Sequence, residues 1–313
     1  MRTPDDETPR SYSAPGALSA PDQSLDGVVA ILDRRYPRGT AEDWDAVGLV
    51  TGDPAQRVRK VMLAVDPTGD VVDEAIAWGA DLLVTHHPLL LRAVHSVAAT
   101  SFKGALIHRL IRAGVALYVA HTNADAAAGG VADALADAVG LVDLVPLVPV
   151  KDGAGAGAGT GIGRVGRLEQ PMSLRAFGER VAAALPATEQ GVRLAGDLAA
   201  TITRIAVVGG SGDSLFDAVR AAGVDAYLTA DLRHHPASEL RERALFEQSH
   251  SGGPGRAAGP ARPFLIDVAH FASEWPWLER AAAALVGDLA GHGTTVVTRV
   301  STLRTDPWTA RLD

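Results

Sequence analysis

The sequence predicts an α/β fold of two pseudo-repeated lobes of βαβ units, with mixed sheets flanked by helices and a metal site between the lobes. Two observations lead to this prediction: the second half of the chain resembles the first, and a stretch rich in Gly and Ala separates them. With 313 residues, 47% of them hydrophobic and 21% charged, the chain has the composition of a globular protein and the length of about two domains.

The repeat predicts the strands and helices of each lobe. "KVMLAV" (60–65) aligns with "RIAVVG" (204–209), and without a gap "GADLLVT" (79–85) aligns with "GVDAYLT" (223–229). In each half an apolar run of about five residues is followed by a polar turn, a helical pattern of about ten residues and a second apolar run. This order predicts a βαβ unit and favours parallel pairing of its strands.

A repeated phrase predicts a further strand in each half. "VAHTNAD" (119–125) and "VAHFASE" (268–274) both place a histidine at the end of an apolar run and a carboxylate shortly after it. The two phrases therefore mark the ends of equivalent strands.

The composition of the remaining segments predicts the domain boundaries. Residues 163–200 contain two short strand patterns and a helix that begins near Ser173. The N-terminal residues are rich in Pro, Ser, Asp and Thr and lack the pattern of a secretion signal, so we expect a cytoplasmic protein. We predict a disordered tail (1–24), a first lobe (25–147), a Gly/Ala linker (148–162), a bridging segment (163–200) and a second lobe (201–313) with a flexible loop (251–263).

Composition excludes several classes of protein and site. Cysteine is absent, which rules out disulfides, thiolate nucleophiles and Cys-based metal sites. The net charge of −8 disfavours nucleic acid as a partner, because nonspecific affinity for phosphate depends on clustered Lys and Arg. No apolar run approaches the ~20 residues that span a bilayer, so we expect no membrane association.

Imidazoles and carboxylates follow three of the predicted strands. His86 and His87 follow a buried-looking strand, and Asp125, His270 and Glu274 lie just beyond two others. In open parallel sheets, ligands gather at the carboxyl ends of the strands. A histidine there can also be a hydrogen-bonded structural residue, but packing would not explain why titratable residues collect at these termini. The five residues are enough to bind two divalent cations.

The residue types indicate which metals would bind. Adjacent residues that leave a strand point in opposite directions, so His86 and His87 would flank two ions unless the chain turns there. Glu274 has two oxygens and can bridge ions ~3.5–4 Å apart, as in two-metal hydrolases. Imidazole and carboxylate ligands suit zinc, iron, manganese or nickel. A water shared by two such ions becomes hydroxide near neutral pH.

Three motifs that would indicate other functions are incomplete, absent or in the wrong context. "GIGRVG" (161–166) follows the linker and does not lead into a helix, which argues against a dinucleotide site. "GGSGD" (209–213) lacks the last glycine of a nucleophile elbow, and the chain has no P-loop. The turn "GGSGDS" (209–214) could offer backbone N–H groups to an anion or could be a simple tight turn.

Taken together, six segments between about residues 25 and 300 give the chain a family resemblance. They are "WDAVGLVTGDP" (44–54), "THHPLLLRAV" (85–94), "HTNADAAAGGVADALA" (121–136), "GGSGDS" (209–214), "LTADLRHHPASE" (228–239) and "DVAHFASE" (267–274). In these segments and their order the chain resembles the Nif-like dinuclear metal-centre proteins, known also as GTP cyclohydrolase 1 type 2 homologs.

The resemblance implies a ligand set and an assembly. His86, His87, Asp125, His270 and Glu274 correspond to the metal ligands of the family, with Glu274 as the bridge. A toroidal homohexamer with metal centres facing an internal cavity is implied as well. The chain departs from the family at Ala46, at Ala269 and in "ADLRHH" (230–235), which leaves open what contact Asp231, Arg233, His234 and His235 make with a substrate.

These observations lead to two hypotheses of different classes. The first is a metal-dependent hydrolase in which a metal-bridging hydroxide attacks a carbon or phosphorus of a nucleotide-like small molecule, with His121 or His235 as proton donor. The family name suggests opening of the imidazole ring of guanine in GTP. The alternative is a non-catalytic hexamer that binds two divalent metal ions (zinc, iron or manganese) as a scaffold or regulator.

Overall fold

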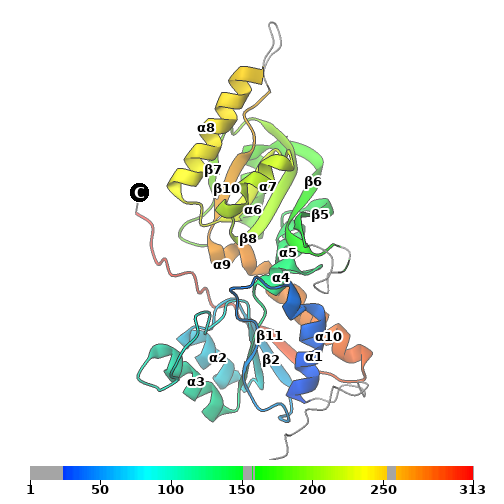
Figure 1. Cartoon of the computed structure of the whole chain (residues 1–313), viewed down its shortest axis with the longest axis vertical. Coiled ribbons are helices and arrows are strands. Elements are labelled where there is room, and N and C mark those ends of the chain that lie inside the picture. Colours follow the sequence, from blue (N-terminus) through cyan, green and yellow to red (C-terminus); the bar gives the residue numbers. More distant parts are fainter. Residues whose placement is uncertain (1–23, 151–156, 158, 252–258, 313) are drawn as a thin grey trace, which may run out of the picture.

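Two sheets with their helices lie at opposite ends of an elongated molecule (Figure 1). The computed structural model describes residues 24–150, 157, 159–251 and 259–312. Almost all of the predicted tail and much of the predicted linker and of the loop at 251–263 lie outside the described residues. Within the described part of the chain, no helix is long and apolar enough to cross a membrane.

The first sheet has five strands in the order β1-β4-β3-β2-β11. The strands are β1 (Gly48–Thr51), β2 (Lys60–Ala64), β3 (Leu82–Thr85), β4 (Ala116–Val119) and β11 (Val297–Val300). The helices of this half are α1 (Leu25–Arg35), η1 (Arg38–Thr40), α2 (Gly69–Trp78), α3 (Phe102–Ala113) and α10 (Pro276–Gly291). Only β1 runs antiparallel to its neighbour, so the sheet is mixed.

Both faces of the first sheet are covered, which explains its continuous apolar strands. In β2, Val61 and Leu63 pack in the cluster that contains residues of α1 and α10. Met62 and Ala64 point the other way, into the cluster with residues of α2 and α3. Because both sides are buried, every position of such a strand favours an apolar side chain.

The second sheet has six strands in the order β5-β6-β8-β9-β10-β7. The strands are β5 (Leu141–Pro149), β6 (Gly161–Ser173), β7 (Arg193–Ala195), β8 (Thr201–Ser211), β9 (Ala226–Ala230) and β10 (Phe264–Val268). The helices of this half are α5 (Val131–Ala138), α6 (Leu174–Ala184), η2 (Asp213–Leu215), α7 (Phe216–Ala221), α8 (His234–Ser251) and α9 (His270–Glu274). The short helix α4 (Thr122–Ala126) lies between the halves, with Ala124 in the core cluster of the first sheet. Residues of α5, α6 and α9 belong to one core cluster on this sheet, and residues of α7 and α8 to another.

The predicted repeat is confirmed. β2, α2 and β3 form a βαβ unit with parallel strands, as do β8, α7 and β9. The repeated Val-Ala-His phrase begins at the ends of β4 and β10, which extend the two units. Antiparallel pairing of β1, β5, β6 and β7 makes both sheets mixed, as the predicted fold class requires.

Sheet membership differs from the boundaries predicted along the chain. β5 lies in the predicted first lobe but pairs with β6 in the second sheet. β6, α6 and β7, predicted to bridge the lobes, are part of the second half. α10 and β11 return to the first sheet, where β11 pairs with β2. Contacts between residues this far apart in the sequence decide these memberships, and the local pattern does not show them.

A buried arginine fixes β6 against the turn that follows α4. Arg164 is 2% exposed and donates from Nε and Nη2 to the two carboxylate oxygens of Asp133, at 2.9 and 2.7 Å. It also donates to the carbonyl oxygens of Ala127, Gly161 and Gly163. This network holds α4, which carries Asp125, in place against the second sheet.

Removal of this guanidinium should destabilise the fold. We expect Arg164→Met to lower the free energy of unfolding by roughly 3–5 kcal/mol, because it leaves buried acceptors unpaired. Arg167→Met on the same strand is the matched control: its partner Asp143 is exposed, so the loss should stay below about 1 kcal/mol. Urea unfolding of the two variants measures the difference, and equal losses would contradict the role given to Arg164.

Candidate metal centre

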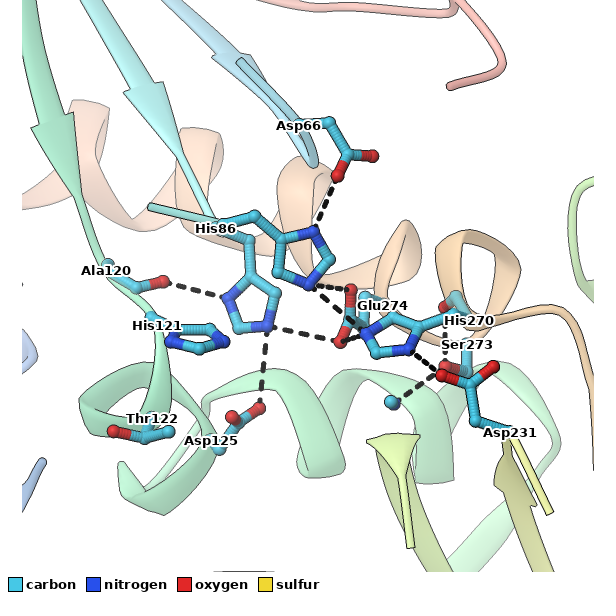
Figure 2. Close-up of polar contacts among 12 residues, drawn as sticks. Asp66, His86, Ala120, His121, Thr122, Asp125, Asp231, His270, Ser273 and Glu274 are labelled. Carbon is cyan, nitrogen blue, oxygen red and sulfur yellow. Dashed lines mark hydrogen bonds and ion pairs between the residues drawn. The ribbon is translucent and has the colours of Figure 1, made fainter. Parts of the chain in front are cut away.

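Side chains from the two sheets converge at one place between them (Figure 2). His86 and His87 directly follow β3, and Asp125 lies on α4, just after β4. His270 and Glu274 are the first and last residues of α9, which follows β10. Their i, i+4 spacing puts both side chains on the same face of that helix. The structure therefore brings together all five residues that the sequence predicts as metal ligands.

Glu274 lies at the centre of the group, as Figure 2 shows. Its Oε1 is 2.9 Å from His270 Nε2 and 3.4 Å from His86 Nε2. Its Oε2 is 3.1 Å from His87 Nε2, which lies 3.2 Å from His270 Nε2. Asp125 Oδ1 is 3.7 Å from His86 Nε2. One carboxylate thus faces three imidazoles, with its two oxygens directed to different rings.

The adjacent histidines do not follow the alternation of a strand. β3 ends at Thr85, the chain bends at His86 and His87, and the Thr85 hydroxyl donates to the carbonyl oxygen of His87 at 2.9 Å. The ring centroids lie 5.1 Å apart, and both rings approach Glu274. The chain thus turns at His86 and His87, which is the condition under which adjacent side chains need not point in opposite directions.

The three imidazoles that face Glu274 each have an oxygen atom close to Nδ1, on the side of the ring away from Glu274. The contacts are His86 Nδ1 to the carbonyl oxygen of Ala120 at 2.8 Å, His87 Nδ1 to Asp66 at 2.7 Å and His270 Nδ1 to Asp231 at 2.7 Å. Since a carbonyl or a carboxylate oxygen accepts, each Nδ1 donates, and each Nε2 is directed toward Glu274. Such partners fix the orientation and tautomer of imidazoles that bind a metal.

Two buried atoms at the centre have no hydrogen-bond partner among the residues that the structure describes. They are His86 Nε2 and Glu274 Oε2. Buried polar atoms in native proteins are almost always paired, so these two call for an additional partner. A divalent cation would supply it, and a donor set of imidazoles and carboxylates without thiolates suits zinc, iron or manganese. The residues present therefore fit the cations that the family implies.

The histidines and Glu274 shift one another's pKa values. Burial by itself would lower the pKa of His87 and of His270, but the charge of Glu274 and hydrogen bonds to the carboxylates behind the rings raise them to about 10 and about 11. Burial by itself would raise the pKa of Glu274, but the three histidines hold it well below its usual value. A cation that binds here would compete with these protons.

The two predicted proton donors, His121 and His235, lie in different surroundings. The ring centroid of His121 lies 5.3 Å from that of His86 and 5.5 Å from that of His87, and its Nδ1 is 2.8 Å from Asp45. Together with His86 and His87 it forms a second group that could hold an ion. His235 is exposed near the start of α8, where its ring packs against His234, and it belongs to neither metal-binding group.

A pocket of about 470 Å³ opens onto the centre. His121, Asp125, His270 and Glu274 line its polar side. Apolar side chains from β5, β6 and the segment after β8 line the rest, together with Trp44, which is 59% exposed. The Trp44 ring meets His121 edge to face at 5.9 Å. The pocket thus combines a polar side, whose residues could hold a cation, with an aromatic and apolar side.

The glycines at the end of β8 lie against the carboxylate. Gly210 has a φ of +69°, and a Cβ there would lie 2.6 Å from Oε1 of Glu274 and 3.1 Å from Nε2 of His270. Its N–H donates to the Ser273 hydroxyl at 2.8 Å, so it is not available to an anion. "GIGRVG", in contrast, lies within β6, which agrees with the exclusion of a dinucleotide site.

Sequence reasoning missed the carboxylates that orient the imidazoles. Asp66 is the second residue after β2, the strand next to β3, so its position near the carboxyl end was a signal available in the sequence. Asp45 lies in the segment "WDAVGL", and its place in that family motif was the one signal in the sequence for a functional role. Asp45 also binds the backbone N–H of Thr122, which fixes the start of α4.

Known proteins resemble the chain over most of its length. A "GTP cyclohydrolase 1 type 2 homolog" of Streptomyces coelicolor is 51% identical over 288 residues, which cover 92% of this chain and 94% of the relative. A protein of the same name from Mycobacterium tuberculosis is 39% identical and covers 91% of this chain and 96% of its own.

Solved structures share the fold. A hypothetical protein of Staphylococcus aureus superposes with a TM-score of 0.77 at 27% identity, covering 92% of this chain and 99% of its own. A Bacillus cereus protein related to NIF3 gives a TM-score of 0.76 at 23% identity, with 90% and 97% covered. The family model described as Duf34/NIF3 (NGG1p interacting factor 3) matches residues 24–307. The chain therefore belongs to the Duf34/NIF3 family.

Proposed function

We propose that the protein binds two divalent cations and is a metal-dependent hydrolase that acts on a nucleotide-like small molecule. The observation that carries the proposal is the position of Glu274, buried among three imidazoles and next to a pocket large enough for a small molecule. The name of the relatives, "GTP cyclohydrolase 1 type 2 homolog", supports GTP as the first substrate to test.

The five residues would hold the cations in two overlapping sets. Glu274 would serve both, with His87 and His270 in one set and His86 in the other. Asp125 adds a carboxylate beside His86. Two divalent cations, when bound, supply Lewis acidity and make hydroxide available near neutral pH.

His121 is suited to transfer a proton. Its Nδ1 donates to Asp45, which leaves Nε2 as the atom that exchanges a proton with a substrate in the pocket. Hydrogen bonds from His121 and Thr122 hold the pKa of the Asp45 carboxyl far below its usual value, although burial opposes this. Asp45 thus stays ionised and keeps the imidazole oriented.

Trp44 should bind the base of a nucleotide. Its exposed ring beside the polar side of the pocket offers a surface for stacking, which is worth about 1–3 kcal/mol per base. We therefore expect Trp44→Ala to weaken GTP binding by roughly tenfold or more, and Trp44→Phe to retain most of it. Trp308→Ala is the matched control, because Trp308 is 64% exposed and lies outside the pocket. Equal losses in the Trp44→Ala and Trp308→Ala proteins would exclude a stacking role.

Formate release from GTP tests the proposed activity. Protein loaded with manganese, zinc or iron should release formate as the imidazole ring of guanine opens, and a chelator should stop the reaction. Full occupancy by two cations without turnover of any nucleotide would contradict the hydrolase and leave a metal-binding scaffold or regulator.

A further inference from the structure

A second cavity, of about 370 Å³, contains none of the residues of the metal centre. It is lined by β7, β10, α8 and the segment before α8, elements that lie side by side in Figure 1. Its size is within the range of small-molecule sites. Leu232 and His234 of the "ADLRHH" segment belong to its wall, whereas Asp231 of the same segment binds His270. The segment therefore contributes residues both to the wall of this cavity and to the surroundings of the candidate metal centre.

Arg241 of α8 lines this cavity and has no carboxylate partner within the described part of the chain. Its Nη1 donates to the carbonyl oxygens of Ala261 and Pro263, at 2.9 and 2.5 Å, and its guanidinium lies 5.3 Å from the centre of the Phe264 ring. These contacts fix the group in one orientation and leave the donors on Nη2 and Nε without an acceptor among the described residues. A preoriented, half-buried cation of this kind favours an anion beside it.

The one acid of the cavity wall is already neutralised. Asp267 accepts from Arg193 Nε at 2.8 Å, from Gln190 at 2.9 Å and from the backbone N–H of Leu232 at 3.0 Å. Arg193 also lines the cavity, close to Asp267, and its side chain is 61% exposed. Arg241 therefore has no ion-pair partner among the described residues, in a chain whose net charge is −8.

We propose that this cavity binds a small organic anion, with a phosphate or carboxylate group on Arg241 and an apolar body against Leu194 and Leu265. A guanidinium binds either group through two parallel hydrogen bonds. The cavity is larger than a bare ion requires, and Leu194, Ala195 and Leu265 suit a carbon skeleton. The site is independent of the cations and of the hydrolase activity.

Titration calorimetry with phenyl phosphate and with benzoate tests the site on the full chain as purified. We expect at least one probe to bind, and the tighter of the two identifies the anionic group. Arg241→Gln should weaken binding by about tenfold or more, because a charge-assisted hydrogen bond is lost. Ser238→Trp, at an exposed position of α8 in the cavity wall, should do the same by filling the space without removing a hydrogen bond of Arg241.

Two controls distinguish this cavity from other sites. Arg243→Gln removes an exposed arginine of the same helix that pairs with Glu247, and should leave binding unchanged. Glu274→Gln should also leave it unchanged, since the metal centre does not take part. Absence of binding by both probes, or binding that Glu274→Gln abolishes and both Arg241→Gln and Ser238→Trp preserve, would overturn the proposal.

Discussion

Replacement of Glu274 by glutamine is expected to lower the affinity for the cations by more than about 100-fold, because substitution of residues behind metal ligands already costs about 10–100-fold. Glutamine has nearly the same shape but no negative charge, so it cannot offset two cations or bridge them with two anionic oxygens. Release of formate from GTP should be lost together with the metal. Isothermal titration with manganese or zinc, followed by the activity assay, measures both effects.

Glu279→Gln is the matched control for this substitution. Glu279 lies on α10, five positions further along the chain, and is exposed. Its replacement should change neither metal affinity nor turnover. If the Glu274→Gln protein bound two cations as tightly as the Glu279→Gln protein, Glu274 could not be the shared ligand.

Gly210→Ala should disrupt the centre without changing any ligand. A methyl group at this position would lie 2.6 Å from Oε1 of Glu274, and this buried carboxylate has little room to move away. The positive φ adds roughly 1 kcal/mol of strain for any residue with a Cβ. We expect metal affinity to fall by at least about tenfold, a change that corresponds to 1.4 kcal/mol.

Gly223→Ala separates the steric effect from the backbone strain. Gly223 has a similar φ of +61°, but no atom lies within 4 Å of the position of its Cβ. This variant should lose a comparable amount of folding stability and bind metal normally. Thermal unfolding and metal titration of both proteins give the comparison, and normal metal binding by Gly210→Ala would show that the end of β8 does not confine Glu274.

The repeat made much of the fold and the ligand set predictable. In both halves an apolar run, a helix and a second run indicated parallel strands, and such strands place their carboxyl ends at the same edge of a sheet. The sequence alone therefore groups the residues that follow those runs, which are His86, His87, Asp125, His270 and Glu274. The structure places them in one cluster.

The rest depends on contacts that no local pattern encodes. β11 pairs with β2 although most of the chain lies between them, and a short strand of alternating exposure carries little information about its partner. Asp66 meets His87 only because the chain bends after β3. The constraint on Gly210 and the cavity around Arg241 arise from packing between elements that lie far apart in the sequence.

Metal content, measured on protein purified without chelators and combined with anomalous scattering from its crystals, tests the central claim most directly. The account predicts two ions per chain, both within reach of Glu274, one of them beside His86 and the other beside His87 and His270. A single ion, or two ions bound away from Glu274, would contradict it.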